Sequence, residues 1–259
     1  MAAPADILRE AAHRVWPLPA WPWVATQTWS RLLFAHWPVA PDQLRPLVPA
    51  VLELDTFDGQ AWLGVVPFEV SAFTLRGRLP LPGATAFPEI NVRTYIQGRG
   101  RPGVYFFSLD TPNWLAVAGA RLACLPYYHA RIAVLPEGEL IKYASERTPA
   151  TPAPRAFTGA YEPASDVFLA QPGSLERWLT ERYCLYTRDP LGDVLRGEIH
   201  HYPWPLQLAR AVVTRNTMLP LAVAEPCNPP SLLYAREITS LFWPFVPDRV
   251  GRSGSRDGL

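Results

Sequence analysis

The pattern of hydrophobic and polar residues along the chain has mostly the two-residue period of β-strands. The extended segments predicted from it are 24–34, 52–57, 60–68, 88–97, 104–109, 130–134, 140–145, 167–168, 184–187, 194–201 and 232–239. Asp58-Gly59 separates two of these segments and is typical of a tight hairpin turn. Residues 98–103, rich in Gly and Arg, predict a second turn. We therefore expect a mainly β (α+β) fold.

A few segments have helical spacing instead. Residues 5–15 predict an amphipathic helix, and residues 116–124 a short one. Residues 174–183 predict the best-defined helix, with Ser174 and Glu176 near its start. Asp42 is expected to cap a short helical turn that ends near Pro46. These elements are too few for a helical bundle.

Composition supports one mainly β domain. Thirty prolines among 259 residues are about 12%, which long interior helices do not tolerate. No repeat or internal linker divides the chain. We expect residues 1–23 to form a helix followed by a Trp/Pro-rich arm packed across the body, and residues 24–247 to form the domain. Residues 148–154 are expected to form a surface loop, and residues 248–259 a flexible polar tail.

Charge and hydropathy narrow the classes of function. Lys and Arg total 24 against 23 Asp and Glu, so the net charge of +1 argues against a nucleic-acid-binding protein. The most apolar stretch, 114–126, is too short to cross a bilayer and contains Arg121. The N-terminus has no apolar signal segment. We expect a cytoplasmic protein with no membrane association.

No motif indicates a metal or a cofactor. The three cysteines are far apart and form no C-x-x-C pair. His200 and His201 are adjacent, so on a strand they would point to opposite faces and could not easily share an ion. No G-x-S-x-G, P-loop or G-x-G-x-x-G sequence is present in a suitable context. We therefore predict no metal and no cofactor.

Residues 88–96 are the most informative segment for chemistry. With strand periodicity, Glu89, Asn91, Arg93 and Tyr95 share one face, opposite Ile90, Val92, Thr94 and Ile96. Two interpretations remain open at this point: a half-buried strand with its polar face in water, or a strand whose polar face lines a pocket. In the second case the carboxyl group would act in acid–base chemistry and the guanidinium would hold an anion.

Several segments resemble the YqjF-like family of uncharacterised proteins over roughly residues 24–243. The segments are QTW (27–29), LFAHWPV (33–39), LDTFDGQAWLG (54–64), FPEINVRTY (87–95), RPGVYFFSLD (101–110), RYCLY (182–186) and IHHYPWPLQ (199–207). This family looks like a relative of acetoacetate decarboxylase. The resemblance implies an acetoacetate decarboxylase-like antiparallel β-barrel with a few peripheral helices and a central pocket.

The lysine that forms a Schiff base in acetoacetate decarboxylase has no counterpart here. The segment 120–129 resembles the one that carries it, but Tyr127 and Tyr128 stand at the two lysine positions. A tyrosine cannot form an imine, so Schiff-base decarboxylation is not expected. The only lysine, Lys142, is expected to be a solvated surface residue.

The resemblance nevertheless implies a site. Glu89 is similar to the acidic residue near the Schiff base, which favours the pocket-lining interpretation. We expect Glu89, Tyr127 and Tyr128 to be catalytic. The predicted ligand-binding residues are Asn91, Arg93, Tyr95, His129 and His200, the last because it shares a strand face with Glu198.

These residues predict a protein that binds a small organic acid or oxo-acid and acts on it as a lyase, isomerase or hydratase. The alternative is a non-catalytic barrel that binds a metabolite or serves as a dimeric scaffold, with Glu89 and Arg93 as a structural ion pair. A small carboxylate or carbonyl compound is the expected partner, and a homodimer is left open.

Overall fold

The described part of the chain is built on one continuous sheet. A computed structural model describes residues 3–76, 86–148, 154–222 and 227–248. The strands of these residues are β1 (Ala25–Val39), β2 (Glu53–Leu54), β3 (Ala61–Leu75), β4 (Phe87–Gly98), β5 (Arg101–Thr111), β6 (Tyr127–Glu137), β7 (Leu140–Arg147), β8 (Ala156–Pro163), β9 (Cys184–Arg188), β10 (Val194–His200), β11 (Leu206–Asn216), β12 (Ser231–Phe242) and β13 (Val246–Pro247). The predicted mainly β class is confirmed.

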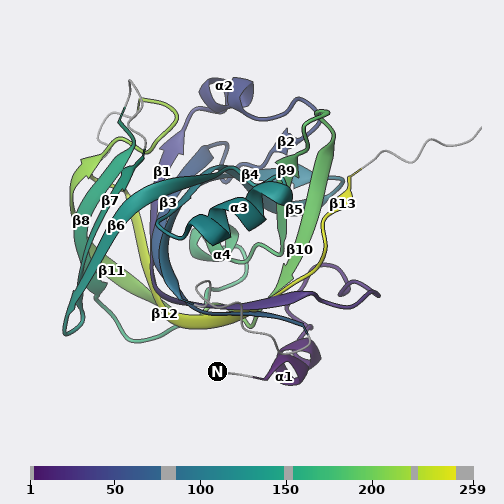
Figure 1. Ribbon diagram of the computed structural model, residues 1–259, viewed down its shortest axis with the longest axis horizontal. Helices are drawn as coiled ribbons and strands as arrows, with labels where there is room; N and C mark the ends of the chain where they lie inside the picture. Colours follow the sequence, from purple (N-terminus) through teal and green to yellow (C-terminus); the bar gives the residue numbers. More distant parts are fainter. Residues whose placement is uncertain (1–2, 77–85, 149–153, 223–226, 249–259) are drawn as a thin grey trace, which may run out of the picture.

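The sheet closes on itself through two pairings beyond its linear order, β4 with β5 and β10 with β12. The strands β12, β1, β3, β4, β5, β9 and β10 consequently form a closed ring. A second circuit shares β12, β1, β3, β4 and β5 with this ring and closes through β6, β7, β8 and β11. Figure 1 shows α3 (Trp114–Leu122) and α4 (Leu175–Thr180) within the outline of the first ring, and β6, β7, β8 and β11 beside it.

Two pairings depart from the expected antiparallel arrangement. β5 runs parallel to both β6 and β9. Parallel neighbours need a crossover connection, and α3 lies between β5 and β6 in the chain. This crossover places α3 against the ring, where it becomes one wall of the interior.

The predicted turns are present, with differences in what they join. Asp58 and Gly59 both have positive φ (49° and 77°), and Phe57 bridges Gln60 as in a tight hairpin. The segment before this turn, however, pairs with β4 rather than β3. Arg99 and Gly100, with φ of 48° and 71°, connect β4 to β5 inside the predicted turn at 98–103.

The helices begin close to their predicted starts; α3 keeps its predicted length, shifted by two residues, whereas α1 and α4 are shorter than predicted. The Ser174 hydroxyl accepts a hydrogen bond from the Arg177 amide (3.2 Å), as a cap should, yet α4 ends at Thr180. Helix α1 (Pro4–Arg9) also ends early, because the following segment turns toward β10. The cap predicted at Asp42 is wrong: α2 (Pro41–Leu44) begins before it, with Pro41 in the first turn. A 3₁₀ turn, Arg45–Leu47, follows.

The strands β8 and β11 were missed by the sequence pattern. Their sequences mix Ala, Gly, Arg and Thr, so neither shows the clear alternation of a half-buried strand. They pair with each other and with β7 and β12. The loop predicted at 148–154 and the tail predicted at 248–259 lie mostly outside the described residues.

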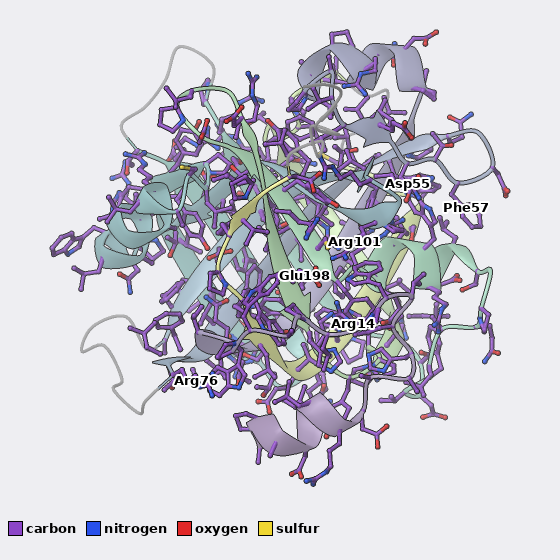
Figure 2. The ribbon with its side chains drawn as sticks, turned by 90° about the vertical axis from the view of Figure 1, so that its right-hand side faces the viewer. Arg14, Asp55, Phe57, Arg76, Arg101 and Glu198 are labelled. Carbon is purple, nitrogen blue, oxygen red and sulfur yellow. The ribbon has the colours of Figure 1, made fainter. Side chains whose placement is uncertain are left out.

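The N-terminal arm is fastened to the outside of β10 by a buried carboxylate. Glu198 accepts hydrogen bonds from the Arg14 guanidinium (2.9 Å) and the Trp16 indole (2.9 Å), and it also contacts Arg101. Arg14 donates a further bond to the Ile199 carbonyl (2.7 Å). Figure 2 shows Arg14, Glu198 and Arg101 gathered on this side of the molecule. The arm therefore packs across the body of its own chain.

Among the described residues, no helix is long and apolar enough to cross a membrane.

We predict that Glu198→Gln lowers the free energy of unfolding by about 3–5 kcal/mol, because it leaves the buried Arg14 guanidinium with less counter-charge. Urea denaturation followed by circular dichroism measures the change. The matched control is Glu137→Gln, which breaks an exposed ion pair with Lys142 and should cost about 0–1 kcal/mol. Equal losses for the two variants would contradict this account.

Candidate functional site

The interior of the first ring holds a cavity of about 750 Å³. Strands β1, β3, β4, β5, β9, β10 and β12 supply its walls, together with α3. Most of the lining is apolar, and its Phe and Trp side chains are Trp29, Phe34, Phe68, Phe73, Phe87, Phe106, Trp204, Phe242, Trp243 and Phe245. A cavity of this size with few polar groups is typical of a small-molecule site.

Strand β4 contributes the polar strip of this cavity. Glu89, Asn91 and Arg93 line it, whereas Ile90 and Val92 are fully buried in the core of the second circuit. The alternation that the sequence predicted is therefore present, and the structure places the polar face in a cavity rather than in bulk water. Glu89 and Asn91 are only 3% and 5% exposed.

Glu89 is held by Tyr127, which begins β6. The Tyr127 hydroxyl donates a hydrogen bond to Glu89 Oε2 at 2.8 Å. Burial raises the pKa of Glu89, the hydrogen bond from Tyr127 opposes the rise and the nearby Asp110 carboxylate adds to it, with a resulting pKa of about 8. Burial also raises the pKa of Tyr127 well above its ordinary value. At neutral pH Glu89 is therefore a protonated acid that can donate a hydrogen bond into the cavity.

Arg93 lies further along β4 and faces a different set of groups. Its guanidinium donates weak hydrogen bonds to the Tyr95 hydroxyl (3.3 Å) and the Leu179 carbonyl (3.4 Å). Among the described residues it forms no ion pair. Glu89 makes its hydrogen bond with Tyr127 instead, so the predicted alternative of a structural Glu89–Arg93 ion pair is wrong.

Tyr95 supports Arg93 and is not itself part of the cavity lining. It is fully buried and lies 2.6 Å from His36 Nε2. Burial, with a contribution from the charge of Arg93, holds the pKa of His36 well below its usual range. The direction of the bond between His36 and Tyr95 depends on the imidazole tautomer, whereas the Tyr95 oxygen accepts from Arg93 with either tautomer. Tyr95 therefore orients the guanidinium rather than meeting a ligand directly.

Sequence reasoning missed Arg182, a second guanidinium in the cavity lining. This side chain donates to the Trp178 carbonyl (2.6 Å) and pairs with Asp55, but its Nη2 has no partner. Burial lowers the pKa of Arg182. Arg182 belongs to the segment 182–186, which resembles the YqjF-like family, and this resemblance was the signal that could have identified it. The spacing of residues along the sequence did not connect Arg182 with β4.

Three further predicted residues lie outside the cavity lining, namely Tyr128, His129 and His200. The Tyr128 ring stacks under Arg147, whose guanidinium carbon lies 3.8 Å from the ring centre. His129 bonds Thr148 (2.7 Å), and His200 bonds the Ile7 carbonyl (2.8 Å). Tyr128 and His200 are neighbours of the lining residues Tyr127 and His201, and successive side chains on a strand alternate in direction. The structure thus brings together Glu89, Asn91, Arg93 and Tyr127 only.

His201 lines the cavity in place of His200. Its Nδ1 lies 2.6 Å from the Tyr202 carbonyl, and burial lowers the pKa of His201 to about 3. Burial likewise lowers the pKa of His200 to about 4. Both imidazoles are neutral at physiological pH and supply hydrogen-bonding groups without charge.

Lys142 lies outside the cavity lining, as expected. Its side chain is half exposed and pairs with Glu137 at 2.6 Å. Within the described parts of the chain, no group of three His, Cys, Asp or Glu side chains is arranged to hold a metal ion.

Comparisons with known proteins identify related sequences. The profile of DUF2071, described as an uncharacterized conserved protein, matches residues 26–239. The uncharacterized protein YqjF of Bacillus subtilis (strain 168) is 46% identical over 224 residues, which are 86% of this chain and 91% of that protein.

Solved structures show similarity of fold at low sequence identity. An acetoacetate decarboxylase-like enzyme from Sphingomonas wittichii RW1 has a TM-score of 0.58 at 12% identity, covering 91% of this chain and 98% of its own. The enduracididine biosynthesis enzyme MppR, complexed with pyruvate, has a TM-score of 0.60 at 12% identity, covering 90% and 93%. Acetoacetate decarboxylase from Legionella pneumophila has a TM-score of 0.56 at 14% identity, covering 95% and 97%.

The raised pKa of Glu89 predicts a pH-dependent stability. Its carboxyl group binds a proton more tightly in the folded chain (pKa about 8) than in the unfolded one (4.5). The unfolded state therefore holds fewer protons across this window, and stability falls as pH rises from about 5 to 8, by up to about 1.4 kcal/mol per pH unit from this group. Glu89→Gln should remove that slope.

Urea denaturation at several pH values measures the free energy of unfolding of the wild type and of Glu89→Gln. The other titratable groups contribute equally to both pH profiles, so the difference between the profiles reports on Glu89. The control is the exposed Glu137→Gln, which should leave the wild-type slope unchanged. A wild-type profile parallel to that of Glu89→Gln between pH 5 and 8 would show that Glu89 ionises normally in the fold.

Proposed function

The chain belongs to the DUF2071 family of uncharacterised conserved proteins and has an acetoacetate decarboxylase-like fold, and on this basis we propose that it binds an organic acid in the ring cavity and acts on it by acid–base chemistry. The observation that carries the proposal is a buried Glu89 carboxyl group, hydrogen-bonded to Tyr127 and with a raised pKa, in the same apolar cavity as the Arg93 guanidinium, which has no ion-pair partner among the described residues. MppR, which has a similar fold, forms a complex with pyruvate, which supports a carboxylic acid as the class of ligand without fixing its length.

Arg93 is the group proposed to hold the carboxylate. Its guanidinium forms only long hydrogen bonds, of 3.3–3.4 Å, so a carboxylate can replace them with shorter, charge-assisted ones. The apolar walls exclude water and strengthen this contact relative to one on the surface. The ligand would thereby enter in one orientation, with its anionic end at Arg93.

Glu89 is the proposed general acid. In its protonated form it donates to a carbonyl oxygen of the ligand, which polarises the carbonyl group and acidifies the neighbouring C–H bonds. Tyr127 donates to the other side of the same carboxyl group and fixes its direction. Lyases, isomerases and hydratases all use polarisation of this kind, so the proposal covers these three classes of reaction.

Schiff-base chemistry has no support in the cavity. Lys142, the only lysine in the sequence, lies outside the cavity lining and pairs with Glu137. A non-catalytic binding protein remains the alternative, because an apolar cavity with an anion-binding guanidinium suits binding without turnover equally well. Assembly as a homodimer stays a prediction.

We predict that organic acids raise the thermal unfolding midpoint of the wild type in a dose-dependent way, because a ligand that binds only the folded state stabilises it by mass action. Arg93→Met should lose this shift while remaining folded. Differential scanning fluorimetry with a panel of carboxylates and oxo-acids provides the measurement. The matched control is Arg210→Met, on an exposed arginine outside the cavity lining. An identical response from both arginine variants would remove Arg93 from the site.

Glu89→Gln separates catalysis from binding. The amide keeps the shape of the carboxyl group but cannot transfer a proton, so turnover of any acid identified as a substrate should fall by about 10²–10⁴-fold. Binding of the same acid should persist. Tyr127→Phe should have a smaller effect, because it removes only the group that orients Glu89. Unchanged turnover in Glu89→Gln would favour a different acid, and absence of turnover in the wild type would favour the non-catalytic alternative.

A further inference from the structure

The polar groups of the cavity lie at two separate ends. Glu89 and Arg93 are four residues apart on β4, which in an extended strand places their Cα atoms about 13 Å apart. Their contacts lead in opposite directions along the strand. Glu89 is bonded to Tyr127 on β6, whereas Arg93 reaches Tyr95 and the Leu179 carbonyl at the end of α4. One short acid cannot meet both groups.

The Arg93 end carries one uncompensated positive charge. Arg93 forms no ion pair among the described residues, while the charge of Arg182 is balanced by Asp55. Both guanidinium groups lie near the Tyr95 ring, with their central carbons 5.7 and 5.0 Å from its centre. Arg182 Nη2 is buried and has no partner. A single carboxylate would neutralise this end and satisfy the unpaired donor.

The Glu89 end suits a neutral oxygen instead. Glu89 is a protonated donor at neutral pH, and the nearby Asp110 carboxylate is already paired with Arg147. The cationic side chains of the described cavity lining, Arg93 and Arg182, belong to the other end, so a second anion would meet no counter-charge here. A dicarboxylate or a phosphate at both ends is therefore disfavoured. A carbonyl or hydroxyl oxygen would accept the hydrogen bond that Glu89 can donate.

The middle of the cavity is apolar and includes a polar atom that has no hydrogen-bond partner among the described residues. Val66 and Phe68 of β3 stand opposite Asn91 and Glu89, and both line the cavity. Asn91 Oδ1, halfway along the strip, is buried without a partner. At roughly 30 Å³ per non-hydrogen atom, the share of one water in the liquid, 750 Å³ holds roughly 25 such atoms. A four-carbon oxo-acid would leave most of this apolar space empty.

We propose that the ligand is an elongated monoanionic acid. Its carboxylate binds between Arg93 and Arg182, an apolar chain or ring fills the middle of the cavity, and a carbonyl or hydroxyl oxygen remote from the carboxylate meets Glu89. This inference rests on the proposed function and specifies the class of acid: the reacting oxygen is several bonds away from the carboxylate, unlike that of a 2-oxo or 3-oxo acid of four carbons.

The test is isothermal titration calorimetry with straight-chain monocarboxylates from butanoate to dodecanoate. Affinity should rise about fourfold for each added methylene that enters the cavity, corresponding to about 0.8 kcal/mol each, and then level off when the chain reaches the Glu89 end. Octanedioate should bind at least tenfold more weakly than octanoate, because its second carboxylate meets the Glu89 and Asp110 end.

Val66→Phe isolates the role of the middle of the cavity. The larger ring should obstruct the space beside Asn91, so decanoate affinity should fall more than tenfold while that of butanoate stays within twofold. The control is Val212→Phe, which adds the same ring at an exposed valine on β11. If Val66→Phe fails to fold, the same experiment is done with Ala116→Phe, which narrows the cavity from α3.

The outcomes separate this inference from the proposed function. If acids of every length bind the wild type with equal affinity, and Arg93→Met abolishes this binding, the elongated ligand is overturned but the carboxylate site at Arg93 is supported. Binding of no acid by the wild type would overturn both. Long acids whose binding is unaffected by Arg93→Met would also overturn both, because the cavity would then hold apolar chains without a carboxylate contact.

Discussion

The alternation of side chains along β4 is the constraint on which the rest of the structure depends. This strand belongs to both closed circuits, so it must place apolar residues in one interior and cavity-lining residues in the other. A shift of one residue in its register would move Glu89 and Arg93 into the packed core and Ile90 and Val92 into the cavity. Uncompensated burial of those polar groups would cost several kcal/mol each. Pairing with β3 on one side and β5 on the other prevents such a shift.

Two buried glutamates, Glu198 and Glu89, have different surroundings and therefore different charge states. Glu198 faces Arg14, Arg101 and the Trp16 indole, and its contacts attach the N-terminal arm to β10. In the part of the chain that the structure describes, Tyr127 is the hydrogen-bond partner of the Glu89 side chain, and an apolar cavity lies in front of it, so its proton is retained. The same side chain is thus part of a charged network in one place and a neutral acid in the other. The difference lies in the number of cationic groups within reach.

Arginine replaces lysine almost throughout the chain, and this changes what the cavity can do. A guanidinium stays charged where an ammonium group would release its proton, so it serves as an anion holder rather than a nucleophile. Arg93 and Arg182 both lie over aromatic rings, which offsets part of the cost of burying them. Under the proposed function, an acetoacetate decarboxylase-like fold whose lysine lies outside the cavity would recognise an acid by its charge and act on it through a neutral carboxyl group.

The sequence by itself determined the local features: the mainly β class, the turn at Asp58-Gly59, the cap at Ser174 and the two faces of β4. Each of these follows from neighbouring residues, whose side-chain directions and backbone preferences are set over two to four positions. It also identified Glu89, Asn91, Arg93 and Tyr127 as members of one site, partly through the resemblance to a known family.

Only the tertiary structure decided which groups meet across the chain. The closure of the ring brings Arg182 to Arg93, places His201 rather than His200 in the cavity, and turns Tyr128 toward Arg147. It also separates Glu89 from Arg93, which the sequence had left as a candidate pair. These contacts depend on strand pairings between residues that are distant in sequence, and on burial, which sets the charge of Glu89. Neither is encoded in the spacing of nearby residues, because both arise only when the sheet closes around the cavity.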